Sequence, residues 1–156
     1  MISLLNLLLR LARCTSGTAA LEGALVLPVA ISLMAGGIEF GRIFVNYATA
    51  DESMRSAARY LARVPQGAIC GWGLTNAKNL AVYGKLNPSA NDVSLIPGWT
   101  TGTVTLSSPA DCGALADPVI IDLRAAVAFN SLMLSAVGLS NSFTLNVGHQ
   151  ERHIGE

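Results

Sequence analysis

The stretch SGTAALEGALVLPVAISLMAGG, residues 16–37, decides which architecture this chain can adopt. No side chain from Gly23 to Ile38 is charged, and a helix needs about 20 mainly apolar residues to cross a bilayer. Apolar residues on either side bring the run to this length, provided that the membrane helix tolerates Glu22 and Glu39. The stretch therefore predicts a membrane-spanning helix within an apolar segment at residues 18–45.

The composition agrees with membrane contact. Of 156 residues, 51% are apolar and only 13% are charged, and the formal net charge is zero. This balance is too apolar for a typical soluble domain, and the length suits one ordinary domain. No basic tract interleaved with aromatic residues occurs, so nucleic acid is not an expected partner. Low charge also means weak mutual repulsion, which favours packing against other copies.

Two kinds of residue in the segment bear on its packing. Pro28 would break a helix in water, because it lacks an N–H and crowds the preceding turn, but neighbouring helices make it tolerable in membranes. Gly36, Gly37 and Gly41 have no side chains and allow another helix to approach closely.

Helical periodicity continues beyond the apolar segment as far as Pro65, which ends it. Large apolar side chains recur at helical intervals, so one long helix is predicted over about residues 18–64. Outside the membrane this helix is expected to become amphipathic and to pack against a small sheet. The side chains expected to make that contact are Phe44, Tyr47, Met54 and Leu61.

Arginines form another face of the same helix. Arg55, Arg59 and Arg63 are spaced four residues apart. Glu52 is placed to pair with Arg55 or Arg59 across the intervening turns. Because arginines lie on both sides of the apolar segment, charge bias alone leaves the orientation of the span undecided.

The remaining residues predict a small domain of mixed structure. A loop at residues 65–75 precedes a short helix at 76–85, capped by Thr75. Alternation of apolar and polar residues predicts strands, and a helix is the alternative for residues 121–129. The predicted strands are residues 93–95, 103–106, 121–129 and 142–147, with turns at 97–118 and an apolar connector at 131–140. The predicted fold class is α+β, a long N-terminal helix followed by a small antiparallel sheet.

The three cysteines lie on both sides of the apolar segment. Cys14 precedes it, whereas Cys70 and Cys112 follow it. If the latter side faces an oxidising compartment, Cys70 and Cys112 can pair; otherwise they are two separate buried thiols. The spacing of cysteines and histidines matches no metal site, so neither a metal nor another cofactor is predicted.

Other polar motifs fall short of a catalytic site. His149 and His153 in HQERH are four residues apart, but Gln150 stands where a zinc-protease helix needs glutamate. Asp117 and Asp122 are interpreted as turn and strand-surface carboxylates. No Ser–His–Asp or Cys–His set is suggested, so we expect a protein that is not an enzyme.

Glu22 is the ionisable residue that most needs an explanation. A charged side chain at membrane depth costs on the order of 2.5–3.5 kcal/mol. Glu22 therefore either lies at the hydrated interface or awaits a cationic partner. A free α-amino group would be such a partner, if the chain were cut just before the apolar segment.

The sequence GTAALEGALVLPVAISLMAGGIEFGRIFVNYATADESMRSAARYLA, residues 17–62, resembles the TadE-like pseudopilins of tight-adherence (Flp-type) pilus systems. A glycine, four residues and a glutamate open the apolar helix, as at a type IV prepilin processing site. The LVLP and IEFGR motifs follow at the expected distances. The resemblance covers about residues 10–64. Residues 65–156 share with the family only their general order, a cysteine-bearing loop followed by alternating strands.

This resemblance implies a prepilin leader at residues 1–17, which a prepilin peptidase removes by cutting between Gly17 and Thr18. It implies a transmembrane and protruding helix at residues 18–64 and an extracytoplasmic α+β domain at 65–156. The protein would be single-pass in the bacterial inner membrane, with the leader cytoplasmic and the outer domain periplasmic. That location supports a disulfide between Cys70 and Cys112.

The implied function is that of a minor pseudopilin in the assembly of an adhesive pilus. Cleavage would give Thr18 an ammonium group, which Glu22 of a neighbouring subunit can neutralise in lipid. The pair would favour association and set its register. The implied partners are other pilins and pseudopilins, the pilus assembly machinery, the prepilin peptidase and membrane lipid.

Two other interpretations are open. Residues 48–50, Ala-Thr-Ala, fit the small-x-small rule, and cleavage after Ala50 would release a soluble binding domain. Glu39 and Arg42 within the apolar region of such a signal argue against this. The chain is also compatible with an uncut, membrane-anchored envelope protein whose outer domain is enzymatic or binds a ligand, although no convergent polar set is visible.

Overall fold

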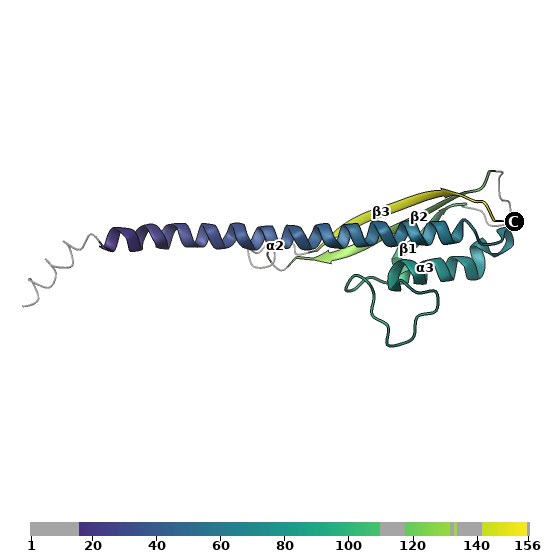
Figure 1. The fold of residues 1–156 in the computed structure, drawn as a ribbon, viewed down its shortest axis with the longest axis horizontal. Coiled ribbons are helices and arrows are strands. Elements are labelled where there is room, and N and C mark those ends of the chain that lie inside the picture. The colour runs from purple at the N-terminus through teal and green to yellow at the C-terminus, as the bar shows by residue number, and fades with distance from the viewer. Residues whose placement is uncertain (1–15, 110–117, 132, 134–141, 156) are drawn as a thin grey trace, which may run out of the picture. The chain divides into compact units, whose positions relative to one another are not determined.

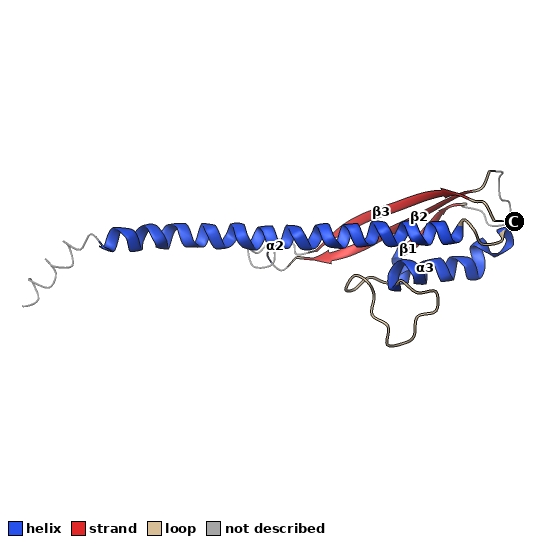
Figure 2. Ribbon diagram, viewed as in Figure 1, coloured by secondary structure: helices blue, strands red, loops and turns tan. Residues whose placement is uncertain are grey.

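The structure is a computed structural model that describes residues 16–109, 118–131, 133 and 142–155. The chain forms two compact units, Met1–Glu39 and Phe40–Glu156. The described residues form helices, one small antiparallel sheet and the loops between them, which confirms the predicted α+β class (Figure 2). The predicted leader lies almost entirely outside the described residues, as do Cys14, Asp117 and most of the apolar connector.

Helix α2, Ser16–Leu61, contains 46 residues and confirms the long helix predicted from the sequence (Figure 1). It ends at Leu61 rather than at Val64, and a turn leads into Pro65. Pro28 lies inside the helix without ending it. The Ser32 hydroxyl donates a hydrogen bond to the Pro28 carbonyl at 2.8 Å, so the turn beside the proline is tied locally.

The unit Phe40–Glu156, which we call the outer unit, contains a three-stranded antiparallel sheet in the order β1–β2–β3. Strands β2 and β3 pair from Ile120 opposite Arg152 to Asn130 opposite Ser142. The helical alternative for residues 121–129 is therefore wrong, because alternate side chains of β2 are buried on one face, as a strand requires. The strands are β1 Val104–Ser108, β2 Ile120–Asn130 and β3 Ser142–Arg152.

Helix α2 packs in the core of the outer unit largely through small side chains. Alanine dominates its buried face, and Met54 and Leu61 supply the larger buried volumes, as predicted. Small side chains allow the helix backbone to come close to its neighbours. The fully buried members of this core on α2 and β2 are Ala50, Met54, Ala57, Ala58, Leu61, Ile121, Leu123 and Val127.

The predicted contacts of Phe44 and Tyr47 with the sheet are wrong. Phe44 is 65% exposed and Tyr47 is 45% exposed, whereas Ile43 and Asn46 are the half-buried residues of this part of α2. The strands cross α2 at an angle (Figure 1), and sheets twist. The face of the helix that meets the sheet therefore changes along its length.

The segment between α2 and β1 is more helical than predicted. Two short turns, Gln66–Ala68 and Ile69–Gly73, lead directly into helix α3, Leu74–Tyr83. The predicted Thr75 cap is wrong, because Gly73 before the helix already has helical dihedral angles and Thr75 lies in the first turn. The Thr75 hydroxyl instead donates to the Gly71 carbonyl at 3.4 Å. A further short turn, Thr101–Thr103, precedes β1.

The predicted strand at residues 93–95 is absent. The Leu95 N–H donates to the Val82 carbonyl of α3 at 2.8 Å, so its backbone is bonded to the helix instead of a strand. The Ser94 hydroxyl donates to the Ile96 carbonyl at 2.7 Å. Val93 is 82% exposed and cannot contribute to a core.

The C-terminal residues close on the end of α2. The N–H groups of Ile154 and Gly155 donate to the Ala62 carbonyl at 2.9 and 3.1 Å. A ring nitrogen of His153 lies 2.8 Å from the Val64 carbonyl oxygen. A Cβ at Gly155 would lie 2.5 Å from that same oxygen, so only glycine fits this approach.

Candidate processing and assembly site

The predicted processing residues lie in the first turns of α2. Gly17, Thr18 and Glu22 are all exposed. A Cβ built at Gly17 would meet no atom within 4 Å, so there is open space beside this residue in the first turn of α2. Among the described residues, the Glu22 carboxylate has no hydrogen bond or ion pair.

The surroundings of Glu22 are apolar and uncovered. Every residue from Gly17 to Met34 is exposed, including Leu21, Leu25 and Val26, whose exposed fractions are 65%, 68% and 64%. An apolar surface of this extent needs lipid or other helices around it. Within the described residues, one helix, Gly17–Leu61, is long and apolar enough to cross a membrane, with a mean hydropathy of 1.8 in its most apolar part. It is a candidate membrane anchor.

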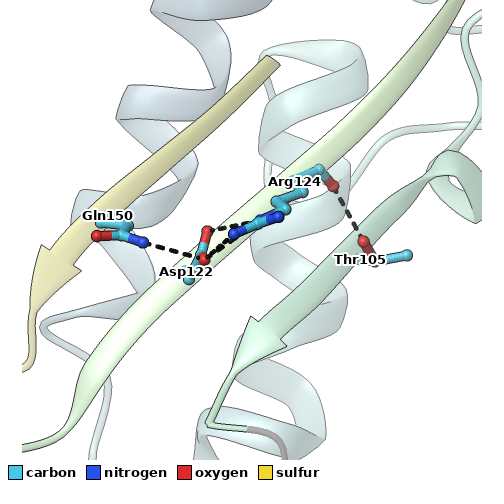
Figure 3. Close-up of polar contacts among 4 residues, drawn as sticks. All are labelled: Thr105, Asp122, Arg124 and Gln150. Carbon is cyan, nitrogen blue, oxygen red and sulfur yellow. Dashed lines mark hydrogen bonds and ion pairs between the residues drawn. The ribbon is translucent and has the colours of Figure 1, made fainter. Parts of the chain in front are cut away.

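A polar network ties the three strands of the outer unit together (Figure 3). The Arg124 side chain donates to the Asp122 carboxylate at 2.9 and 3.2 Å, and Gln150 donates to it at 3.1 Å. The Thr105 hydroxyl of β1 donates to the Arg124 carbonyl at 3.3 Å. Asp122 is 6% exposed, so the predicted strand-surface carboxylate is in fact buried.

The same bonds set the ionisation of Asp122. Hydrogen bonding from Arg124, assisted by Gln150 and by the positive charge of Arg124, holds the pKa of this carboxyl below its usual range despite the opposing effect of burial. The carboxylate therefore stays charged and engaged within the sheet. We interpret it as a structural link between strands.

An aromatic cluster closes the end of the sheet nearest to residue 40. The Phe129 and Phe143 rings, on β2 and β3, have centroids 5.0 Å apart. The Arg42 guanidinium lies 5.6 Å from the centroid of the Phe129 ring, a cation–π distance. This contact joins the first turn of α2 in the outer unit to the sheet.

The arginine face of α2 is arranged differently from the prediction. Arg55 pairs with Asp51 at 3.5 Å, and Arg59 lies 4.0 Å from Glu151 of β3. The predicted pairing of Glu52 with Arg55 or Arg59 is therefore wrong. Periodicity along α2 could not reveal Glu151, which lies on a distant strand.

A groove of about 520 Å³ lies along this arginine face. Its lining includes Arg59 from α2, Arg63 from the turn after α2, and Trp72 from the short helical segment Ile69–Gly73. Trp72 is 55% exposed, an unusual exposure for so large an apolar side chain. The sequence signalled only the arginines, because the position of Trp72 depends on the turns that follow α2.

The predicted disulfide is described at one of its two cysteines. Cys70 is disulfide-bonded and half-buried. Cys112 lies outside the described residues, so the identity of the partner stays a prediction.

His149 bonds to Glu151 through a ring nitrogen at 3.1 Å. Among the described ranges, no group of three His, Cys, Asp or Glu side chains is placed to hold a metal ion.

Comparison with known proteins identifies the N-terminal part of the chain. Searches of curated proteins and of solved structures found no match. Residues 17–59 match a family model described as TadE-like protein. The match begins at the predicted processing glycine, contains Glu22 and extends along α2 as far as Arg59. It confirms the resemblance inferred from the sequence, and the segment from Gly17 to Arg59 is therefore TadE-like.

Proposed function

We propose that this chain is a minor pseudopilin that takes part in the assembly of an adhesive Flp/Tad-type pilus. The observation that carries the proposal is the TadE-like match over residues 17–59, which coincides with a candidate membrane anchor. In this role the chain is a structural component and not an enzyme. Its partners are other pilins and pseudopilins and the pilus assembly machinery.

The anchor holds the chain in the bacterial inner membrane, with the outer unit on the periplasmic side. A prepilin peptidase removes residues 1–17 by cutting between Gly17 and Thr18. Gly17 and Thr18 are both exposed, which supports access by the peptidase. A periplasmic location is also consistent with a disulfide at Cys70, for which Cys112 is the proposed partner.

Glu22 then has a physical role in assembly. Its carboxylate is exposed among apolar side chains and has no partner in the described residues. In lipid, an unpaired charge costs on the order of 2.5–3.5 kcal/mol. Pairing with the Thr18 ammonium of an adjacent subunit recovers part of this cost for both groups, so the pair drives association within the membrane.

Mass spectrometry of the mature protein tests the processing step. We expect a chain that begins at Thr18. A chain that begins at Asp51 would support the secreted alternative, and an intact Met1 would support the uncut anchor. The full burial of Ala50 inside α2 argues against cleavage there, because the cut would open the core.

Substitution of Glu22 tests the assembly role. Glu22→Gln and Glu22→Ala should leave membrane insertion intact and impair piliation, as counted by electron microscopy and by pilin shed from cells. Glu22→Asp keeps the charge and is the matched control, which should retain pili. Normal piliation in Glu22→Ala would remove the proposed role.

A further inference from the structure

Trp72 is exposed although the segment that carries it is tied down on both sides. Its side chain is 55% exposed. The next residue, Gly73, is buried, and a Cβ there would lie 2.8 Å from Cγ1 of Val64, so the backbone packs directly against the residues that follow α2. Two residues before Trp72, Cys70 is disulfide-bonded. The fold therefore holds a large aromatic ring in solvent at a fixed place.

The groove beside Trp72 is positively charged. We call it the arginine groove: it has a volume of about 520 Å³ and is lined by Arg59, in the last turn of α2, and Arg63, in the turn after it. None of the described residues that line it is acidic. Within the described part of the chain, the Arg63 side chain has no hydrogen bond or ion pair. Arg59 lies 4.0 Å from Glu151 through its Nε, so the terminal amino groups of its guanidinium stay available to a ligand.

The rest of the arginine groove is mainly apolar. Val64 and Pro65 line it, together with the ring of Tyr60. The Tyr60 hydroxyl already accepts a hydrogen bond from the Asn76 side chain at 3.1 Å, and Ser56 supplies the other hydroxyl of the lining. Such a lining would leave many hydroxyl groups of a sugar without partners, which is costly. An apolar side chain flanked by carboxylates matches both the lining and its charge.

The residue types in the arginine groove are typical of protein interfaces. Tryptophan, tyrosine and arginine carry most of the binding energy at such interfaces, and Trp72, Tyr60 and Arg59 bring all three types together here. The volume of the groove falls in the range of sites that bind small ligands, so it accepts a few side chains and not a folded surface. In an extended segment, alternate side chains point the same way and can enter together.

We propose that the arginine groove docks an extended segment of a partner protein in which carboxylates flank an apolar side chain. The carboxylates pair with Arg59 and Arg63, because each guanidinium offers a planar fork of donors that fits a carboxylate. The apolar side chain packs against Trp72, and the exclusion of water strengthens the ion pairs. The groove lies wholly within the outer unit, so this inference goes beyond the proposed function and depends on neither the anchor nor the processing step.

Fluorescence of the full-length protein in detergent micelles tests the docking. The chain has two tryptophans, and Trp99 is only 3% exposed, so a ligand in the groove changes the emission of Trp72. The probe is the peptide acetyl-Asp-Ser-Leu-Ser-Asp-amide, which places two carboxylates and a leucine on one face when extended. We expect a saturable shift of the emission to shorter wavelength, and about tenfold weaker binding when asparagine replaces both aspartates. Trp72→Phe should abolish the shift. Equal binding of the two peptides, or no saturable shift, would overturn the proposal.

Substitution of single arginines tests the ion pairs. Arg63→Gln breaks no contact among the described residues and should weaken binding of the aspartate peptide several-fold, with the near-ultraviolet circular dichroism of Trp99 unchanged. Arg55→Gln is the matched control, because Arg55 pairs with Asp51 at 3.5 Å and does not line the groove. It should bind the peptide as the wild type does. Equal weakening in both variants would indicate general attraction between charges and would refute a specific site.

Polygalacturonate distinguishes a protein partner from an acidic glycan. It carries carboxylates without apolar side chains, so we expect it to shift the Trp72 emission only at a higher concentration of carboxylate than the peptide requires. Tighter binding of polygalacturonate would assign the arginine groove to an acidic glycan and overturn the proposal.

Cell fractionation separates this inference from the proposed function. A chain that is found in the membrane and begins at Thr18, but does not bind the aspartate peptide, would refute the docking and leave the proposed function standing. A chain that binds the peptide but is recovered outside the membrane would refute the proposed function and leave the docking intact.

Discussion

The contrast between Met54 and Phe44 gives the most direct test of how α2 sits on the sheet. Both residues belong to the set of large apolar side chains that periodicity assigns to one helix face. In the structure Met54 is fully buried, whereas Phe44 is 65% exposed. Truncation of the two residues to alanine should therefore have very different effects on the stability of the outer unit.

The magnitudes follow from burial. Met54→Ala removes a buried side chain and leaves a cavity, which lowers the free energy of unfolding by about 2–5 kcal/mol. At roughly 4 °C per kcal/mol for a unit of this size, the midpoint of thermal unfolding should fall by roughly 8–20 °C. Phe44→Ala removes an exposed side chain and should change the free energy of unfolding by no more than about 0.5 kcal/mol.

Thermal unfolding of the full chain in detergent micelles measures both effects. Trp99 is 3% exposed in the same core, so the near-ultraviolet circular dichroism reports loss of its packing. Comparison at one detergent concentration keeps the membrane helix in the same environment for each variant. If Phe44→Ala lowers the midpoint as much as Met54→Ala, the helix is rotated relative to the structure and the reasoning is refuted.

Three further predictions concern the outer unit. Gly84 follows α3 with a φ of 68°, so Gly84→Ala should lower the free energy of unfolding by roughly 1–2 kcal/mol. Gly67 lies at an open site with ordinary φ, so Gly67→Ala should lower it by less. Hydrogen bonding from Arg124 lowers the pKa of Asp122, so its carboxylate should stabilise the fold above the unfolded pKa near 3.9. This contribution should be lost as the pH falls through the folded pKa. The difference in free energy of unfolding between wild type and Asp122→Asn should therefore shrink in acid, and a difference that stays unchanged from pH 7 to pH 2 would contradict this. Non-reducing digestion should yield a peptide pair joined through Cys70 and Cys112, and Cys112→Ser should lower the free energy of unfolding by about 4 kcal/mol in the chain-entropy model; a Cys70 peptide joined to any other cysteine would disprove the pairing.

The candidate site was only partly predictable from the sequence. The processing glycine and Glu22 could be identified, because their signal is a local order of residue types at the start of an apolar helix. The exposed groove with Trp72 could not, since it depends on how the turns after Pro65 fold back beside α2. The predicted partners of Glu52 failed for a similar reason, because Glu151 approaches Arg59 from a strand that is remote in sequence.

Local patterns were sufficient for the elements themselves. An uncharged apolar run, its helical continuation and the alternation in β2 and β3 each reflect the geometry of one segment, so the long helix and the main strands followed from residue order. The sequence did not determine which face of α2 is buried at each point along it. Phe44 and Met54 are both large apolar residues at helical spacing, and they differ only in which segments lie beside them in the fold. That difference comes from the crossing of a twisted sheet over a helix, a relation between segments that no single segment encodes.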